Sequence, residues 1–398
     1  MKVLLLHDYG TATGGAELQM LSLRQGLLDR GHDVRLFSSR AIPVPNSKLL
    51  SEYHCFGTTS LLQVLSQTAN PSAYWSLRHA LAEFKPDVVH VRMFLWQLSP
   101  LILPLLNDVP CLYQTAVYKA ICPLGTKVLP DGSPCLDTAG KACLNHKCLT
   151  PQSWVVYMVQ RQLWQRWRRA FNLVVALSYA MKAKLEAEGI QPVEVVHNGV
   201  PERPMRPPLS NPPTVAFAGR LVPEKGASVL LQAFARTHFQ VPQARLLIAG
   251  QGVEEASLRV LADQLGIAES VIWLGHLPRH ELEQQFDSAW IQVVPSLWAE
   301  PFGNVTTEAM IRGTAVVASA VGAQPEIVTD GETGFLIPPN NVDALSAALE
   351  RLLLNPTLAE RMGRMGRQQA LTHFSEDRRT ERFIDIYQRL RVRERCHE

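Results

Sequence analysis

Short apolar runs alternate with segments of helical spacing along the whole chain. Runs of four or five apolar residues bounded by turn-forming residues are typical of buried strands in a parallel sheet. The alternation predicts doubly wound α/β domains with helices on both faces of each sheet. In the first half, the expected strands are Val3–Leu6, Val34–Phe37, Val88–Val91, Leu173–Leu177 and Val193–Val196.

A proline-rich segment separates these strands from a second set. Residues 201–213, PERPMRPPLSNPP, hold six prolines in thirteen positions, too many for a helix or a central strand. We interpret this segment as an exposed linker between a Rossmann-like domain over residues 1–200 and a second one over residues 214–376. The strands expected in the second domain are Val215–Ala218, Leu246–Ala249, Val271–Leu274, Ile291–Val294 and Ala315–Ala318.

The end of the chain, residues 377–398, is rich in arginine. Apolar residues recur at roughly helical spacing between Asp377 and Arg395, which predicts an amphipathic helix. We expect this helix to pack back on the N-terminal domain.

Composition excludes several classes of protein. With 46% apolar residues in 398, the chain can fill two cores, and a net charge of +3 is too balanced for a surface built to bind nucleic acid. The first apolar run is too short for a signal peptide, and no charge-free run reaches the roughly 20 residues of a membrane span. These features predict a soluble, cytoplasmic protein without a nucleic-acid partner.

Glycine-rich connections follow several of the expected strands. Gly14 and Gly15 open a helix after the first strand, where backbone N–H groups can approach a phosphate, although a plain tight turn fits equally well. The run AGRLVPEKG places Gly219, Arg220 and Lys225 after the first strand of the second domain, and the two cations suit a diphosphate or simply solvent. A later LLIAGQG run lacks the third glycine of a dinucleotide fingerprint, which argues against an oxidoreductase.

The segment PSLWAEPFGNVTTEAMIRG holds two glutamates, Glu300 and Glu308, separated by seven residues. We expect Glu300 on a loop and Glu308 near the start of a helix. Carboxylates accept hydrogen bonds from sugar hydroxyls, yet glutamates at this position can also be capping charges. The backbone N–H groups expected to face a ligand are those of Phe302, Gly303, Asn304 and Val305.

Together these motifs and the later SAVGAQPEIVTDGETGFLIPP run resemble the retaining GT-B glycosyltransferases of the large fourth family. The resemblance covers nearly the whole chain. It implies that Arg220 and Lys225 bind the donor diphosphate, that Glu300 contacts the transferred sugar and that Glu308 binds the ribose. It also implies that the 302–305 backbone contacts sugar and phosphate, and that Gly15 approaches the diphosphate from the other domain.

The implied activity is metal-independent transfer of a sugar, with retention, from a nucleotide-diphosphate donor to a glycan or lipid-linked acceptor. Arg220, Lys225 and Glu300 are the expected catalytic residues, and no cofactor is expected. The chain has no Asp-x-Asp motif of the kind that holds a diphosphate through a metal ion. A sugar-nucleotide epimerase on the same fold and a non-catalytic nucleotide-sugar binding protein remain alternatives.

The sequence departs from the family pattern in its first half. Ala116 and Val117 stand where many relatives carry a His-Asp pair, shortly before Cys122 and Pro123. His90, at the end of an expected strand, is the nearest substitute, although a histidine packed at a strand end is the simpler interpretation.

Two segments leave alternatives open. Cys122, Cys135, Cys143 and Cys148, with His146 among them, suit a zinc ion, a disulfide or unligated thiols; the chain has seven cysteines in all. Residues 153–170, SWVVYMVQRQLWQRWRRA, combine tryptophans with arginines and no acidic residue. This composition suits either a helix in peripheral contact with the inner face of a membrane or an ordinary packed helix.

Overall fold

A computed structural model describes residues 1–60 and 62–395. The chain forms two compact units. Unit 1 comprises Met1–Pro130, Cys135–Gly199 and Glu376–Glu398, and unit 2 comprises Asp131–Pro134 and Val200–Ser375. Residues 396–398 of the expected C-terminal segment lie outside the described residues.

Unit 1 is built on a parallel sheet of seven strands in the order β3-β2-β1-β4-β5-β6-β7. The prediction of a doubly wound sheet is confirmed. The strands are β1 (Lys2–Tyr9), β2 (Asp33–Ser39), β3 (Tyr53–Cys55), β4 (Val88–Val91), β5 (Cys111–Gln114), β6 (Leu173–Ala176) and β7 (Val193–Val195).

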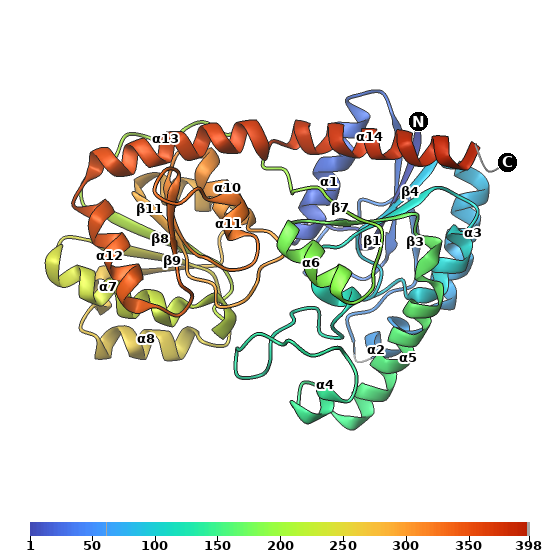
Figure 1. Ribbon diagram of the computed structural model, residues 1–398, viewed down its shortest axis with the longest axis horizontal. Coiled ribbons are helices and arrows are strands. Elements are labelled where there is room, and N and C mark those ends of the chain that lie inside the picture. Colours follow the sequence, from blue (N-terminus) through green and yellow to red (C-terminus); the bar gives the residue numbers. More distant parts are fainter. Residues whose placement is uncertain (61, 396–398) are drawn as a thin grey trace. The chain divides into compact units, whose positions relative to one another are not determined.

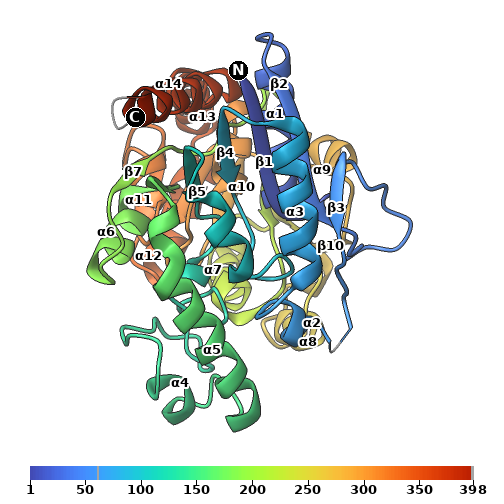
Figure 2. The same ribbon diagram turned by 90° about the vertical axis from the view of Figure 1, so that its right-hand side faces the viewer.

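Helices flank this sheet (Figure 1). They are α1 (Gly15–Leu28), α2 (Gln63–Ser66), α3 (Pro71–Phe84), α4 (Ala142–Asn145), α5 (Pro151–Trp167), α6 (Tyr179–Ala187) and α14 (Glu376–Arg395), with short 3-10 turns η1 (Pro100–Leu106), η2 (Tyr118–Ala120) and η3 (Arg168–Ala170). Helix α14 lies beside α1 and β4 (Figure 2). Its Phe383, Ile386, Tyr387 and Leu390 are buried in the same core as strand β1, so α14 completes the hydrophobic core of unit 1.

Unit 2 repeats the design with a parallel sheet of six strands in the order β10-β9-β8-β11-β12-β13. The strands are β8 (Thr214–Ala218), β9 (Arg245–Ala249), β10 (Val271–Gly275), β11 (Ile291–Val294), β12 (Ala315–Ser319) and β13 (Gly334–Ile337). The helices are η4 (Pro223–Lys225), α7 (Ala227–Gln240), α8 (Glu255–Gln264), η5 (Ala268–Ser270), α9 (Arg279–Gln285), η6 (Phe286–Ser288), α10 (Asn304–Ile311), α11 (Gln324–Ile327), α12 (Val342–Leu353) and α13 (Pro356–His373).

Most of the proline-rich segment is exposed or partly exposed, and one part of it is anchored on unit 2. Arg206 is 3% exposed, and its side chain forms an ion pair with Glu360. Its backbone N–H donates to the carbonyl oxygen of Arg312. The prolines keep the segment extended, while one buried arginine fixes its course.

Each sheet has a switch point where the strand order reverses. In unit 1 it lies between β1 and β4, and in unit 2 between β8 and β11. The connections that leave two such strands run to opposite faces of the sheet, so a crevice opens at their carboxyl ends, where ligands bind in open α/β folds. The loops after β1, β4, β8 and β11 are therefore the places to examine for function.

Candidate functional site

The loops after β8 and β11 are held against each other at the switch point of unit 2. Gly226 is the N-terminal cap of α7 with φ of 69°, and a Cβ there would lie 2.1 Å from the carbonyl oxygen of Pro295. Only glycine permits so close an approach. The backbone N–H of Leu297 also donates to the carbonyl oxygen of Glu224 at 2.9 Å. These contacts place η4, which ends at Lys225, next to the loop that carries Glu300.

Lys225 and Glu300 meet directly in this arrangement. The Nζ of Lys225 lies 2.6 Å from Oε1 of Glu300, and the two side chains are only 20% and 12% exposed. The Ser296 hydroxyl donates to the same carboxylate oxygen at 2.5 Å, and Nζ lies 5.6 Å from the centre of the Trp298 ring. Two residues that are 75 positions apart in sequence thus form a half-buried ion pair at the crevice.

Arg220 lies on the same loop but is much more open to solvent. Its side chain is 66% exposed, and its guanidinium lies 3.4 Å from the Glu224 carboxylate. The preceding residue, Gly219, donates its backbone N–H to the carbonyl oxygen of Ala249. A Cβ on Gly250 would lie 1.8 Å from the carbonyl oxygen of Gly219, so the loops after β8 and β9 also touch. Arg220 therefore has an exposed side chain on a backbone that is held by neighbouring loops.

Glu308 lies on α10 and faces a pocket of its own. Its carboxylate is 3.0 Å from the guanidinium of Arg279, at the start of α9. Burial raises the pKa of Glu308, and the nearby Glu283 carboxylate adds to the rise, while Arg279 opposes it. Ala218, the last residue of β8, lines the same pocket. The pocket thus joins Glu308 to the strand end from which Gly219 and Arg220 continue.

The segment before α10 offers backbone groups rather than side chains. Phe302 is 4% exposed and its ring packs 5.9 Å from that of Phe374. Gly303 is the N-terminal cap of α10, which begins at Asn304, and it has no side chain with which to cap the helix. Val305 lines the pocket of Glu308. The helix begins at Asn304, two residues earlier than the sequence suggests, and the ligand contacts of residues 302–305 stay a prediction.

In unit 1, Gly14 caps α1 and Gly15 is its first residue, as the sequence predicts. A Cβ on Gly14 would lie 2.4 Å from the Glu17 carboxylate. The loop therefore folds closely over an acidic side chain that is itself 9% exposed, and burial raises the pKa of Glu17. The diphosphate contact expected of Gly15 stays a prediction.

The sequence did not point to a buried polar cluster at the strand ends of unit 1. Arg92, 2% exposed, donates to the side-chain oxygens of Gln114 and Asn198, at 2.6 and 3.2 Å. The Nε2 atom of His90 lies 3.1 Å from the same side-chain oxygen of Gln114, and its Nδ1 atom lies 2.6 Å from the Tyr387 hydroxyl. His90 is thus a fully buried strand-end histidine. Arg92 and Gln114 stand at the ends of apolar strands, and the hydrophobic pattern of the sequence does not distinguish them from other polar residues at strand ends.

Two sequence models of protein families match the chain. "Glycosyl transferase 4-like domain" matches residues 14–199, and "Glycosyl transferases group 1" matches residues 203–369. The chain belongs to the group 1 glycosyl transferases. Together the two matches span most of both units, so the expected family is confirmed.

Two relatives of this glycosyl transferase are mycobacterial. A GDP-mannose-dependent alpha-(1-6)-phosphatidylinositol monomannoside mannosyltransferase of Mycolicibacterium smegmatis is 34% identical over 45% of this chain and 48% of its own length. A D-inositol 3-phosphate glycosyltransferase of Mycobacterium ulcerans is 36% identical over 50% of this chain and 45% of its own length. The chain spans about half the length of the curated relatives it matches.

Solved structures share the fold. Sucrose-phosphate synthase from Thermosynechococcus elongatus aligns with a TM-score of 0.72 at 21% identity, covering 98% of each chain. HepE from Anabaena, solved with UDP and glucose, aligns with a TM-score of 0.68 at 18% identity, covering 97% of this chain and 99% of that one. The GT-B architecture expected from the sequence is confirmed. Within residues 1–60 and 62–395, no helix is long and apolar enough to cross a membrane.

Proposed function

We propose that this group 1 glycosyl transferase moves a sugar from a nucleotide-diphosphate donor to a glycan or lipid-linked acceptor, with retention of configuration. The ion pair of Lys225 and Glu300 at the switch point of unit 2 is the observation that carries the proposal. It combines a cation and a carboxylate at the carboxyl ends of two central strands, which is where ligands bind in open parallel sheets. A diphosphate needs the first group, and sugar hydroxyls need the second.

Lys225 acts on the departing nucleotide. When the bond between the sugar carbon and the diphosphate oxygen breaks, negative charge grows on that oxygen, and a fixed ammonium stabilises it more in the transition state than in the ground state. In the free protein Glu300 balances this ammonium at 2.6 Å. The donor therefore shares Lys225 with Glu300 instead of meeting an unpaired buried cation. Arg220, exposed on the same loop, adds a second positive charge from the solvent side.

Glu300 binds the transferred sugar through its other oxygen. Lys225 and Ser296 both donate to Oε1, so Oε2 is the oxygen that receives a sugar hydroxyl. Glu308 binds the ribose hydroxyls from its pocket, and the backbone of Phe302, Gly303, Asn304 and Val305 contacts sugar and phosphate. Gly14 and Gly15, at the start of α1, offer backbone N–H groups that suit a phosphate.

Attack by the acceptor hydroxyl on the same face as the leaving group gives retention. The leaving phosphate oxygen takes the acceptor proton, so no separate protein nucleophile is required. Charge on the diphosphate is balanced by Lys225 and Arg220, and the reaction proceeds equally with and without added Mg²⁺.

Nucleotide release tests the proposal. UDP-glucose and GDP-mannose are offered separately, with and without simple glycan or lipid acceptors, to wild type and to Lys225→Met. We expect one donor to be consumed by wild type in an acceptor-dependent way, with a product of retained anomeric configuration by NMR. We expect Lys225→Met to lose about 100-fold or more in turnover.

Arg236→Met is the matched control, because Arg236 is an exposed cation of the same unit, 56% exposed on α7. It should retain wild-type turnover. A sugar changed in configuration without acceptor would establish an epimerase, and donor binding without any turnover would establish a binding protein. Equal turnover of wild type and Lys225→Met would remove the diphosphate role of Lys225.

We also propose that α5 brings the protein to an anionic membrane surface. Trp164 is buried, 3% exposed, and its ring N–H donates to the carbonyl oxygen of Ala120, so this part of the helix is core. The opposite side of α5 carries Val155 and Val159, 55% and 43% exposed, and the exposed Arg166, and the exposed Arg169 follows in η3. An apolar patch followed by arginines along one exposed side suits lipid headgroups and acyl chains.

Co-sedimentation with vesicles of phosphatidylglycerol tests this contact. A variant with Arg166→Glu and Arg169→Glu should lose most of its binding, and neutral vesicles should bind neither protein. Arg168 is left unchanged because it donates to the carbonyl oxygen of Gly189 and so holds the fold. Equal sedimentation of wild type and variant would show that α5 is only a packed helix.

A further inference from the structure

The segment between η2 and α5 has almost no core of its own. From Val128 to Cys148, all described, no residue is buried, and α4 with four residues is its only helix. Leu136 is 91% exposed. A segment of this length cannot keep one conformation through apolar burial alone. Small folds with little apolar core gain stability from disulfides or a bound metal ion.

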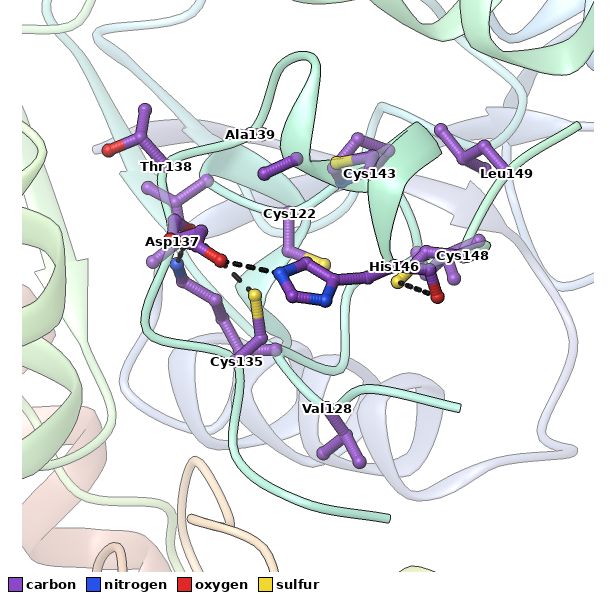
Figure 3. A pocket seen from close by; sticks show the side chains of 15 residues that line it. Cys122, Val128, Cys135, Asp137, Thr138, Ala139, Cys143, His146, Cys148 and Leu149 are labelled. Carbon is purple, nitrogen blue, oxygen red and sulfur yellow. Dashed lines mark hydrogen bonds and ion pairs between the residues drawn. The ribbon is translucent and has the colours of Figure 1, made fainter. Parts of the chain in front are cut away.

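Four cysteines of this segment surround one pocket. Cys122, Cys135, Cys143 and Cys148 all line it, and all are half-buried free thiols. Figure 3 shows them on different sides of the pocket, with the His146 ring between Cys135 and Cys148. Residues far apart in this loop thus line one pocket.

The backbone around the pocket is already organised. The N–H of Cys135 donates to the carbonyl oxygen of Lys127 at 2.9 Å, and that of Leu149 donates to the carbonyl oxygen of Cys143 at 3.2 Å. The Trp154 ring N–H, from α5, donates to the carbonyl oxygen of Gly140 at 2.9 Å. The first two bonds order the loop itself, and the third ties it to α5.

We propose that Cys122, Cys135, Cys143 and Cys148 bind a zinc ion that serves as the core of this segment. Four thiolates satisfy the tetrahedral preference of zinc, and a site without an open position is structural. The described residues hold no group of three ligands already gathered for a metal. The thiols therefore turn towards the pocket centre when the ion enters, as in domains whose folding is coupled to metal binding.

The charge balance is consistent with the surroundings. Binding releases one proton from each thiol to solvent, and four thiolates with one Zn²⁺ carry a net charge of −2. Lys127 lines the pocket, is 8% exposed, and donates to the carbonyl oxygen of Asp137 at 2.6 Å. Its ammonium offsets part of that charge.

His146 has a separate role beside the thiolates. Its Nε2 lies 2.7 Å from the Asp137 carboxylate, and the Cys135 thiol donates to the Asp137 carbonyl oxygen at 3.8 Å. The histidine and aspartate thus orient the turn that carries Cys135. Replacing His146 should weaken zinc binding less than replacing a cysteine.

Metal analysis of the full-length protein tests the site. Protein is produced with zinc in the medium and purified without chelator, and metals are measured by mass spectrometry. We expect about one zinc per chain in wild type and less than about one third in Cys135→Ser or Cys143→Ser. Cys111→Ser is the matched control, since Cys111 is a buried thiol outside the pocket that donates to the carbonyl oxygen of Ala170. It should keep its zinc.

Two further measurements keep the test decisive if a cysteine variant fails to fold. Wild type loaded with Co²⁺ should show sulfur-to-cobalt charge-transfer absorption, and release of zinc by a mercurial reagent should expose the segment 122–148 to protease. A wild-type protein with negligible metal, or with these cysteines paired as disulfides, would overturn the proposal. So would a His146→Ala variant that loses all its zinc, because histidine would then replace a thiolate.

Discussion

The two sheets close their switch points with opposite kinds of contact. In unit 1, Asp8 at the end of β1 accepts backbone N–H groups of Trp96, Gln97 and Leu98 in the loop after β4, at 2.7 to 3.0 Å. In unit 2, Glu300 in the loop after β11 pairs with the side chain of Lys225. The three hydrogen bonds of Asp8 hold a loop in place through its backbone. The side chain of Lys225, by contrast, can contact a ligand and Glu300 at the same time. The comparison contrasts a side chain bound to backbone groups with one bound to another side chain, and we propose that the second kind of contact serves ligand binding.

Burial separates the two regions further. Asp8 is fully buried, and burial raises its pKa to about 6 despite three backbone donors. Burial also lowers the pKa of His7 to about 3, with Arg92 adding to the effect, and the pKa of Arg92 itself to about 9. Such shifts often mark active sites, but buried networks that only hold a fold produce them too. In unit 1 they arise around Asp8, whose side chain is fully buried and bonded to three backbone N–H groups.

The largest expected effect is on catalysis in unit 2. Lys225→Met should lower kcat by about 100- to 1,000-fold, because the growing charge on the leaving diphosphate loses its nearest cation. The melting temperature should change little, since the pair lies at the crevice and not in the core. Steady-state nucleotide release and thermal unfolding of the same preparations measure both. A variant that keeps kcat but loses stability would show that the ion pair of Lys225 and Glu300 stabilises the fold, as we expect of Asp8, and has no role in catalysis.

The converse change in unit 1 should act on stability. Asp8→Ala leaves three buried N–H groups without an acceptor, which should lower the free energy of unfolding by about 3 kcal/mol. Asp108→Ala is the control, because Asp108 is exposed. Urea unfolding measures the difference. No loss of stability in Asp8→Ala would end the contrast between the two switch points.

Acid should weaken unit 1 through His90. Burial lowers the pKa of His90 from 6.5 to about 3 in the folded state. Between these values the unfolded chain binds a proton that the folded chain does not, so stability is complete above 6.5 and is lost as pH falls towards 3. Between pH 7 and pH 4 we expect the free energy of unfolding of His90→Gln to fall by about 2 kcal/mol less than that of wild type. Unfolding of wild type and variant at pH 7 and pH 4 measures it, and parallel curves would contradict the assignment.

The smallest expected effect concerns donor affinity in unit 2. Glu308→Gln should raise KM for the donor about tenfold, because a neutral amide is a weaker acceptor for ribose hydroxyls than a carboxylate. It should leave kcat nearly unchanged, as the ribose is remote from the reacting bond. Glu269→Gln, at an exposed position of unit 2, serves as control. A fall in kcat with constant KM would move Glu308 from binding to chemistry.

Local sequence predicted most strands but missed three. Strand β3 has only three residues, β5 reads Cys-Leu-Tyr-Gln, and β13 begins with Gly334. Short or mixed runs give no clear periodicity, and their partners in the sheet decide their conformation. Long apolar runs such as β1 and β12 are predictable because a strand buried on both faces must be continuously apolar.

The sequence by itself determined the α/β class, the family and the residue types available for chemistry, because apolar patterning and motif spacing are local properties. Only tertiary structure decided which of those residues meet. It placed Lys225 against Glu300, which is 75 positions away, and it paired Glu308 with Arg279. It also brought four cysteines around one pocket. Contacts of this kind depend on strand order and loop closure, which no short stretch of sequence encodes.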